Sequence, residues 1–125
     1  SGNKQVMLFA AFGDHQVANI STDVMARTIG AELRAPGLAP GRSADVEPFW
    51  GIPPAPSLPD QGGSYYVMWD FGTPTPPVGN VPNRAGEDPH GMGRSQDEVL
   101  QMALAFLDTG TLVDTCAGGP CQTLP

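Results

Sequence analysis

The chain has 125 residues, the length of one domain, and 40% of them are hydrophobic, a low fraction for a domain that must bury a full core alone. Its 13 acidic and 6 basic side chains give a net charge of -7. The sequence has no run of basic residues that could bind along a phosphate backbone, which argues against nucleic acid and anionic membranes as partners. No stretch approaches the roughly 18 apolar residues that span a bilayer, and the first residues lack the charged and apolar regions of an export signal.

Two short apolar runs predict β-strands. Residues 5–12, QVMLFAAF, form a nearly continuous apolar run that is bounded by polar residues and Gly13. Residues 64–71, SYYVMWDF, are rich in aromatic side chains and are bracketed by glycines. Runs without strict alternation are typical of parallel strands that are covered on both faces.

A first helix is predicted between Ile20 and Gly30. Its apolar residues recur at spacings of four or five along the segment. We expect Ser21 to cap this helix, Asp23 to supply a first-turn acid, and Gly30 to end it in a left-handed conformation.

A second helix has the clearest boundaries in the sequence. Ser95 is predicted as its N-cap and Glu98, three residues later, as the partner in a capping box. A broad apolar face follows, and Gly110 is expected to end the helix.

Proline and glycine divide the rest of the chain into loops. Residues 36–63 contain seven prolines and five glycines and are predicted to form a long insertion loop. A second loop spans 72–94, and residues 111–125 form a C-terminal tail. Cys116 and Cys121 lie in that tail within CAGGPC, a spacing and composition that favour a small-loop disulfide and therefore a secreted or extracytoplasmic protein. Reduced thiols in the tail are the alternative.

The order of strand, helix, long loop, strand, loop and helix predicts an α/β fold with parallel strands, flanking helices and right-handed crossovers. Two strands are too few for a covered parallel sheet. Residues 1–125 are therefore expected to be either a single domain or the C-terminal fragment of a larger one. In the second case the expected partner is the missing N-terminal portion of the same protein, or another copy of the chain.

Polar residues follow both predicted strands, where ligands collect in open parallel sheets. Asp14 and His15 come directly after the first strand, in FAAFGDHQVANI. Asp88 and His90 lie in the loop that follows the second strand. Because the strands are parallel, we expect Asp14 and His90 to face each other across one edge of the sheet.

Two segments resemble elements of the α/β-hydrolase family. GDHQVANISTDVMARTIGA is similar to the segment in which the penultimate strand ends in Gly and Asp and an amphipathic helix follows. EDPHGMGRSQDEVLQMALAFLDTG is similar to the loop histidine and terminal helix of that family. The resemblance implies that the chain is similar to the C-terminal portion of a hydrolase sheet, with residues 36–63 as an insertion.

The resemblance also implies roles in ester or amide hydrolysis. His90 would be the general base, since its unperturbed pKa lies near working pH, and Asp14 would orient it. The acid precedes the base, as in the chain order of this fold. The sequence contains no G-x-S-x-G nucleophile motif, so the nucleophile is expected to lie outside this chain. No cofactor is expected.

Other interpretations remain open for these residues. Asp14 and His90 can be ordinary turn and loop residues, and the chain can be a non-catalytic binding or structural module. Asp70 is an alternative acid, Trp50 is a candidate ligand contact, and His15 is expected to be solvated. A metal site is a further alternative, with these four candidate ligands: His15, His90, Asp14 and Asp88.

Overall fold

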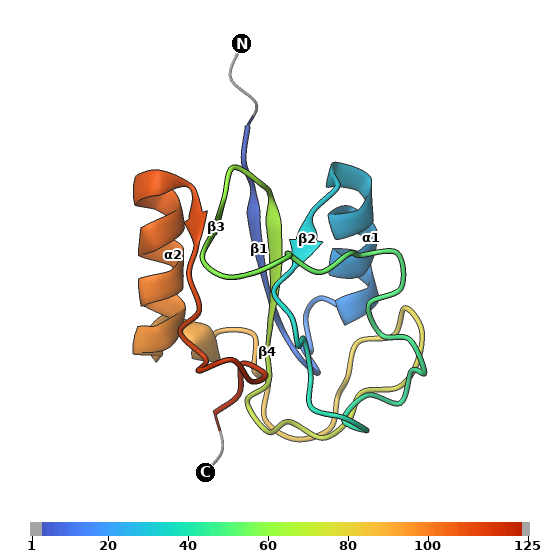
Figure 1. Cartoon of the computed structure of the whole chain (residues 1–125). Helices are drawn as coiled ribbons and strands as arrows, with labels where there is room; N and C mark the ends of the chain where they lie inside the picture. Colours follow the sequence, from blue (N-terminus) through green and yellow to red (C-terminus); the bar gives the residue numbers. More distant parts are fainter. Residues whose placement is uncertain (1–3, 124–125) are drawn as a thin grey trace.

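A three-stranded parallel sheet lies at the centre of the computed structural model, which describes residues 4–123. Its strand order is β1-β4-β2, with β1 at Met7–Ala11, β4 at Tyr65–Trp69 and β2 at Glu32–Leu33. The helix α1 (Asn19–Ile29) covers one face and α2 (Asp97–Thr109) covers the other (Figure 1). The predicted arrangement of parallel strands with flanking helices is thus present.

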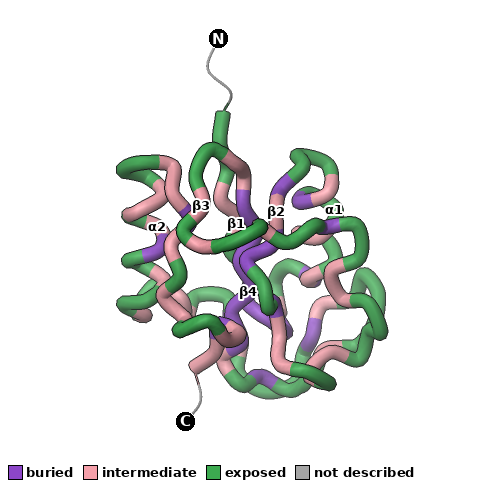
Figure 2. The backbone as a smooth tube through the Cα atoms, viewed as in Figure 1, coloured by how far each residue is buried: buried purple, intermediate pink, exposed green. Residues whose placement is uncertain are grey.

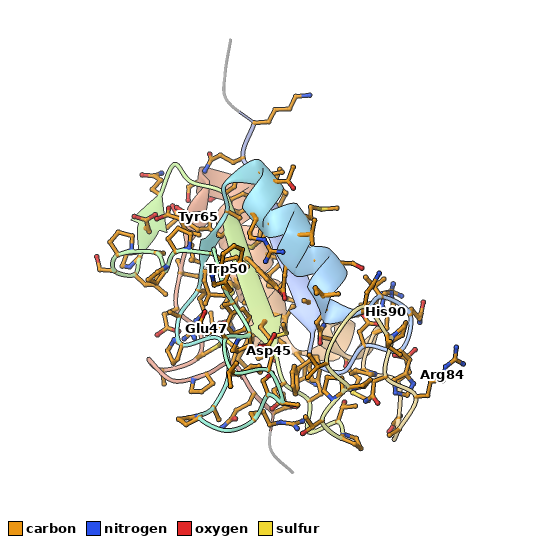
Figure 3. The ribbon with its side chains drawn as sticks, turned by 90° about the vertical axis from the view of Figure 1, so that its right-hand side faces the viewer. Asp45, Glu47, Trp50, Tyr65, Arg84 and His90 are labelled. Carbon is orange, nitrogen blue, oxygen red and sulfur yellow. A yellow bond between two sulfur atoms is a disulfide. The ribbon has the colours of Figure 1, made fainter. Side chains whose placement is uncertain are left out.

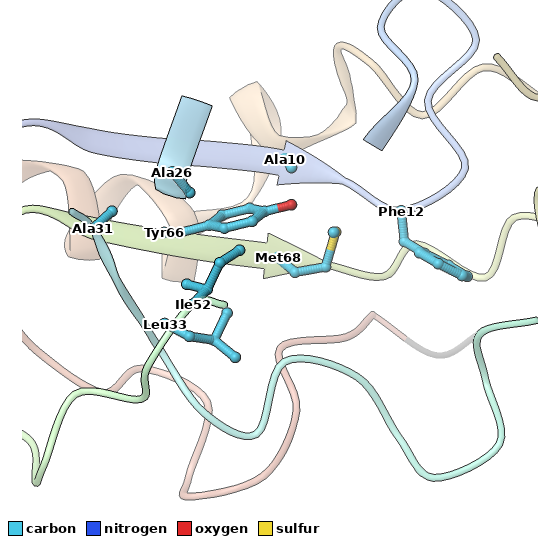
Figure 4. Close-up of a cluster of buried hydrophobic side chains, with 8 residues drawn as sticks. All are labelled: Ala10, Phe12, Ala26, Ala31, Leu33, Ile52, Tyr66 and Met68. Carbon is cyan, nitrogen blue, oxygen red and sulfur yellow. The ribbon is translucent and has the colours of Figure 1, made fainter. Parts of the chain in front are cut away.

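The central strand β4 separates two hydrophobic clusters. Every residue of β4 is buried (Figure 2). Its side chains alternate between the two clusters. The cluster under α1, shown in Figure 4, consists of Ala10, Phe12, Ala26, Ala31, Leu33, Ile52, Tyr66 and Met68. The cluster under α2 consists of Tyr65, Val67, Trp69, Met102, Leu112 and Cys121. A strand buried on both faces explains why residues 64–71 lack an alternating pattern.

Three very short strands were not predicted from the sequence. They are β2, β3 (Asp60–Gln61) and β5 (Thr111–Leu112), and β3 pairs with β5 in a separate antiparallel ladder. Each has two residues, which is too short to show a periodic pattern, so tertiary contacts alone define them.

The start of α1 differs from the prediction. Ala18 is the N-cap and no side chain caps the helix, so the expected roles of Ser21 and Asp23 at the cap and first turn are wrong. The Asn19 side chain instead accepts the N–H of Gly13 at 3.0 Å. Tertiary contact with the end of β1 therefore determines where α1 begins.

The start of α2 differs in the same way. Gln96 is its N-cap, without a side-chain hydrogen bond, so the predicted capping box of Ser95 and Glu98 is absent. Ser95 closes the short 3-10 helix η1 (Met92–Ser95), and its hydroxyl donates to the Met92 carbonyl at 3.2 Å. The predicted helix ends are confirmed, because Gly30 and Gly110 both adopt the left-handed conformation.

The C-terminal segment lies against the end of β4. Cys116 and Cys121 form the predicted disulfide. Beyond it, Asp70 N–H donates to the Cys121 carbonyl at 2.9 Å and Thr123 N–H donates to the Asp70 carbonyl at 2.9 Å. Within the described residues, neither helix is long and apolar enough to cross a membrane.

Candidate functional site

The site lies at the carboxyl ends of β1 and β4. After β1 the chain turns at Gly13, which has φ of 79°. A Cβ atom there would lie only 2.9 Å from Cγ2 of Thr73, so a side chain would not fit. This turn places Asp14 just beyond the sheet, and the loop after β4 returns His90 to the same place.

Asp14 and His90 form a hydrogen-bonded pair. His90 Nδ1 lies 2.8 Å from Asp14 Oδ2. The Asp14 side chain is 9% exposed, whereas that of His90 is 34% exposed. The predicted juxtaposition is confirmed, with the acid buried and the imidazole reaching solvent.

The second oxygen of Asp14 holds its own loop in place. Oδ1 accepts the backbone N–H of Gln16 at 2.7 Å and that of Val17 at 3.1 Å. Asp14 is therefore a turn residue as well as the partner of His90. The turn fixes the carboxylate so that its other oxygen points at the imidazole.

Asp88 joins the two loops, a role that the sequence did not indicate. Its Oδ1 accepts the N–H of His90 at 3.0 Å and that of His15 at 3.2 Å, and its Oδ2 accepts Gln16 Nε2 at 3.0 Å. The Gln16 bond is the main reason that the pKa of Asp88 is lowered; desolvation opposes it, and the two backbone donors assist. Asp88 thus holds the backbone of His90 against the loop that carries Asp14.

His15 is tied to the other loop rather than solvated, contrary to the expectation. It is half-buried, and its Nε2 lies 3.0 Å from the carbonyl oxygen of Ala85. A carbonyl only accepts, so this contact requires a proton on His15 Nε2.

We expect the two histidines to carry their protons on opposite ring nitrogens when neutral. Asp14 accepts only, so His90 must be protonated at Nδ1, which leaves the Nε2 lone pair free; His15 must be protonated at Nε2. Long-range ¹H–¹⁵N NMR correlations on the isolated chain distinguish these forms. The same tautomer at both rings would contradict the arrangement.

Asp70 does not serve as an alternative acid for His90. Its carboxylate binds Arg42 in a bidentate manner, with Nε to Oδ2 at 2.6 Å and Nη2 to Oδ1 at 3.0 Å. Arg42 also donates to the Thr73 carbonyl and to Thr75 Oγ1. These bonds join the two proline-rich loops, which run together near α1 (Figure 1).

The alternative metal site finds no support, because residues 4–123 contain no group of three or more His, Cys, Asp or Glu side chains that could hold an ion. In the same part of the chain, no serine, threonine or cysteine side chain hydrogen-bonds His90. Within the described residues, a carboxylate and an imidazole are thus brought together, without a hydroxyl or thiol group bonded to the imidazole.

A cleft of about 240 Å³ adjoins Asp14. It lies between α1 and the two proline-rich loops, and both Asp14 and Trp50 line it. In Figure 3, Trp50, Asp45 and Glu47 lie on one side of α1 and His90 lies on the other. Asp14 is thus shared between the histidine and the cleft.

Comparison with known proteins found no matching family model, no matching curated protein and no matching solved structure.

Proposed function

We propose that this chain supplies the acid and the general base of a Ser-His-Asp-type site for ester or amide hydrolysis, with the nucleophile provided from outside these residues. The observation that carries the proposal is the 2.8 Å hydrogen bond between His90 Nδ1 and the buried Asp14 carboxylate. An imidazole with one nitrogen held by a fixed carboxylate has its other nitrogen available for proton transfer.

Each residue has a definite part in such a reaction. His90 Nε2 removes the proton of a hydroxyl nucleophile as that oxygen attacks the substrate carbonyl. Asp14 stabilises the imidazolium that results, and the imidazolium then gives the proton to the leaving alcohol or amine. The donors that stabilise the oxyanion must come from the segment that carries the nucleophile.

The free edge of β1 supports a partner at this sheet. No strand of residues 4–123 pairs with the edge of β1 opposite β4. Apolar residues remain exposed in β1, just before it, and on both helices: Val6, Phe9, Ile20, Val24, Met25, Leu100, Leu104 and Leu107. Parallel sheets are normally covered on both faces and paired at such edges. We infer that further strands of a larger sheet pair with the free edge of β1. The whole sheet would then have a C-terminal portion similar to that of an α/β-hydrolase.

The disulfide favours an oxidising compartment. Disulfides persist mainly in oxidising compartments, and Cys116–Cys121 closes a small loop within the tail. A secreted or extracytoplasmic location is part of the proposal.

The experiment compares this chain with a longer parent protein that contains it. We expect the isolated chain to hydrolyse p-nitrophenyl acetate no faster than buffer, because the oxyanion donors and the nucleophile contribute most of the catalysis. A parent protein with an upstream G-x-S-x-G nucleophile motif should hydrolyse the ester and react with a serine-directed phosphonate.

His90→Ala should abolish both reactions of the parent, whereas His15→Ala serves as the matched control and should retain them. Turnover by the isolated chain that survives His90→Ala would overturn the proposal. A parent without any such motif would favour the alternative of a non-catalytic binding module. The cleft beside Asp14 would then be the binding site of that module.

A further inference from the structure

We propose that the cleft beside α1 binds an organic cation, namely an amine or guanidinium group attached to an apolar body. The cavity of about 240 Å³ has room for a group of this kind. Its walls come from three segments: α1, the loop that carries Asp45 to Trp50, and the loop around Val78. The floor is formed by Phe12 and Met68 at the end of the sheet.

The lining of the cleft has an excess of negative charge. Four carboxylates face it, from Asp14, Asp23, Asp45 and Glu47, against the single guanidinium of Arg27. Asp14 is hydrogen-bonded to His90, and the rest of the lining contains three acids, Asp23, Asp45 and Glu47, to one base. A cleft with one dominant sign of charge concentrates ligands of the opposite sign.

Arg27 forms no ion pair with these carboxylates among residues 4–123, although its charge acts on Asp23. Its Nη1 donates to the Trp50 carbonyl at 3.1 Å, and its guanidinium carbon lies 5.6 Å from the centroid of the Trp50 ring. The neighbouring Gly51 has φ of 77°, and a Cβ there would lie 2.8 Å from Cδ of Arg27. Arg27 thus contacts the indole and the backbone of Trp50 and forms no ion pair with the acids among the described residues.

Asp23 is held in the cleft with one oxygen uncommitted. The Tyr66 hydroxyl donates to Oδ1 at 2.7 Å, and no hydrogen bond to Oδ2 is present among residues 4–123. Burial raises the pKa of Asp23 and the charge of Asp45 raises it further, against the hydrogen bond from Tyr66 and the charge of Arg27. A bound cation would relieve the cost of ionising this carboxyl group.

Aromatic surface next to the acids favours a cation with an apolar body. Trp50 is 67% exposed although large aromatic residues are usually covered, and Phe49 lines the same cavity. Aromatic faces attract ammonium and guanidinium groups as well as apolar carbon. The negative charge of the lining disfavours anions, and its apolar aromatic surface disfavours small hydrated cations.

The proposed cation site depends only on the residues that line the cleft. If the proposed hydrolase function also holds, the cleft next to Asp14 is where we expect the cationic part of an ester or amide substrate to bind. That last step rests on the proposed function.

The test titrates the isolated chain with 2-phenylethylamine and follows backbone amide shifts by ¹H–¹⁵N NMR. The neutral 2-phenylethanol and the anionic 3-phenylpropanoate are the matched probes. We expect the amine to shift residues of α1 and the 43–50 loop, to bind at least about tenfold more tightly than the alcohol, and to weaken as salt is added. Equal binding of amine and alcohol, or shifts outside the cleft, would overturn the proposal.

Charge-neutral variants assign the effect to the named acids. Asp45→Asn with Glu47→Gln keeps the Asp45 oxygen that accepts the Glu47 N–H at 3.1 Å, and Asp23→Asn keeps the acceptor for Tyr66. Both should lose most of the preference for the amine. Glu98→Gln with Asp108→Asn, which removes two charges from exposed α2 positions, should retain it; a loss there as well would show only a general charge effect and refute the site.

The outcome is independent of catalysis. A parent protein that does not hydrolyse the ester, although the isolated chain binds the amine, would count against the proposed function alone. Hydrolysis by the parent without amine binding would count against the cleft alone.

Discussion

Asp14→Asn should reduce kcat of the protein completed by its nucleophile segment by about 10⁴-fold, the scale expected when the acid of such a triad is replaced by its amide. The loss arises from the orientation of the new amide. The position of Oδ1 accepts two backbone N–H groups, from Gln16 and Val17, so the oxygen of asparagine must stay there and its NH₂ group must face His90. His90 Nδ1 then has to accept, which moves the proton to Nε2.

A histidine protonated at Nε2 cannot remove a proton from the nucleophile. We therefore expect the NMR signature of His90 in the isolated Asp14→Asn chain to change to the Nε2–H tautomer, while His15 is unchanged. The kinetic measurement and the tautomer should change together, with little change in KM.

Asp88→Asn is the matched control, since it removes one charge from the same loops. Its Oδ1 can still accept the N–H groups of His90 and His15, and the Gln16 amide can rotate to pair with the new NH₂ group. We expect the His90 tautomer to be retained and the loss of activity to be far smaller. Full activity of Asp14→Asn would remove Asp14 from the proposed mechanism.

The sequence predicted the parts of the fold that follow local rules. The apolar runs around β1 and β4 were recognisable because β4 is buried throughout and β1 is buried at its carboxyl end, and Gly30 and Gly110 mark the ends of the helices. The meeting of Asp14 and His90 followed from a single topological rule, that parallel strands bring their carboxyl ends to one edge.

Contacts between distant loops could not be predicted in this way. Asp88 and Gln16 are separated by 72 positions, and Arg42 and Asp70 by 28. Nothing periodic links such residues, and proline-rich loops give no pattern from which their paths can be inferred. The same limitation explains the wrong helix starts, since Asn19 is held by the end of β1 rather than by a local capping motif.

The pairing of Arg34 with Asp114 is a long-range contact of this kind, and its loss should have the largest effect on stability. The Arg34 side chain is 1% exposed, and its Nη2 lies 2.6 Å from Asp114 Oδ1. Nη1 donates to the Pro36 carbonyl at 3.2 Å, while Nε has no partner within the described residues. Asp114 also accepts the N–H groups of Cys116 and Gly118, at 2.8 and 2.7 Å.

Asp114→Ala should therefore lower the free energy of unfolding by about 3–5 kcal/mol, the cost of leaving a buried charge without its partner. Urea denaturation should show a lower midpoint with an unchanged m-value. The exposed Asp108→Ala is the control and should change the unfolding free energy by no more than about 0.5 kcal/mol.

Acid should produce part of the same loss. Burial of Asp114 opposes ionisation, but the hydrogen bonds from Arg34, Cys116 and Gly118 together lower its pKa below 3.8. A carboxyl group with a lowered pKa in the folded state stabilises the protein above its unfolded pKa, and this contribution disappears as the pH falls through the folded value. The stability of Asp114→Ala should consequently depend less on pH below about 4 than that of the wild type.

A second replacement distinguishes the buried charge from the lost turn contacts. Arg34→Met in the Asp114→Ala background removes the unpaired guanidinium but does not restore an acceptor for Cys116 and Gly118. If the buried charge is the main cost, the double variant should be more stable than Asp114→Ala, because apolar replacements of buried ion pairs are often neutral or stabilising. A double variant as unstable as Asp114→Ala would show instead that Asp114 acts chiefly by holding the turn closed by the disulfide.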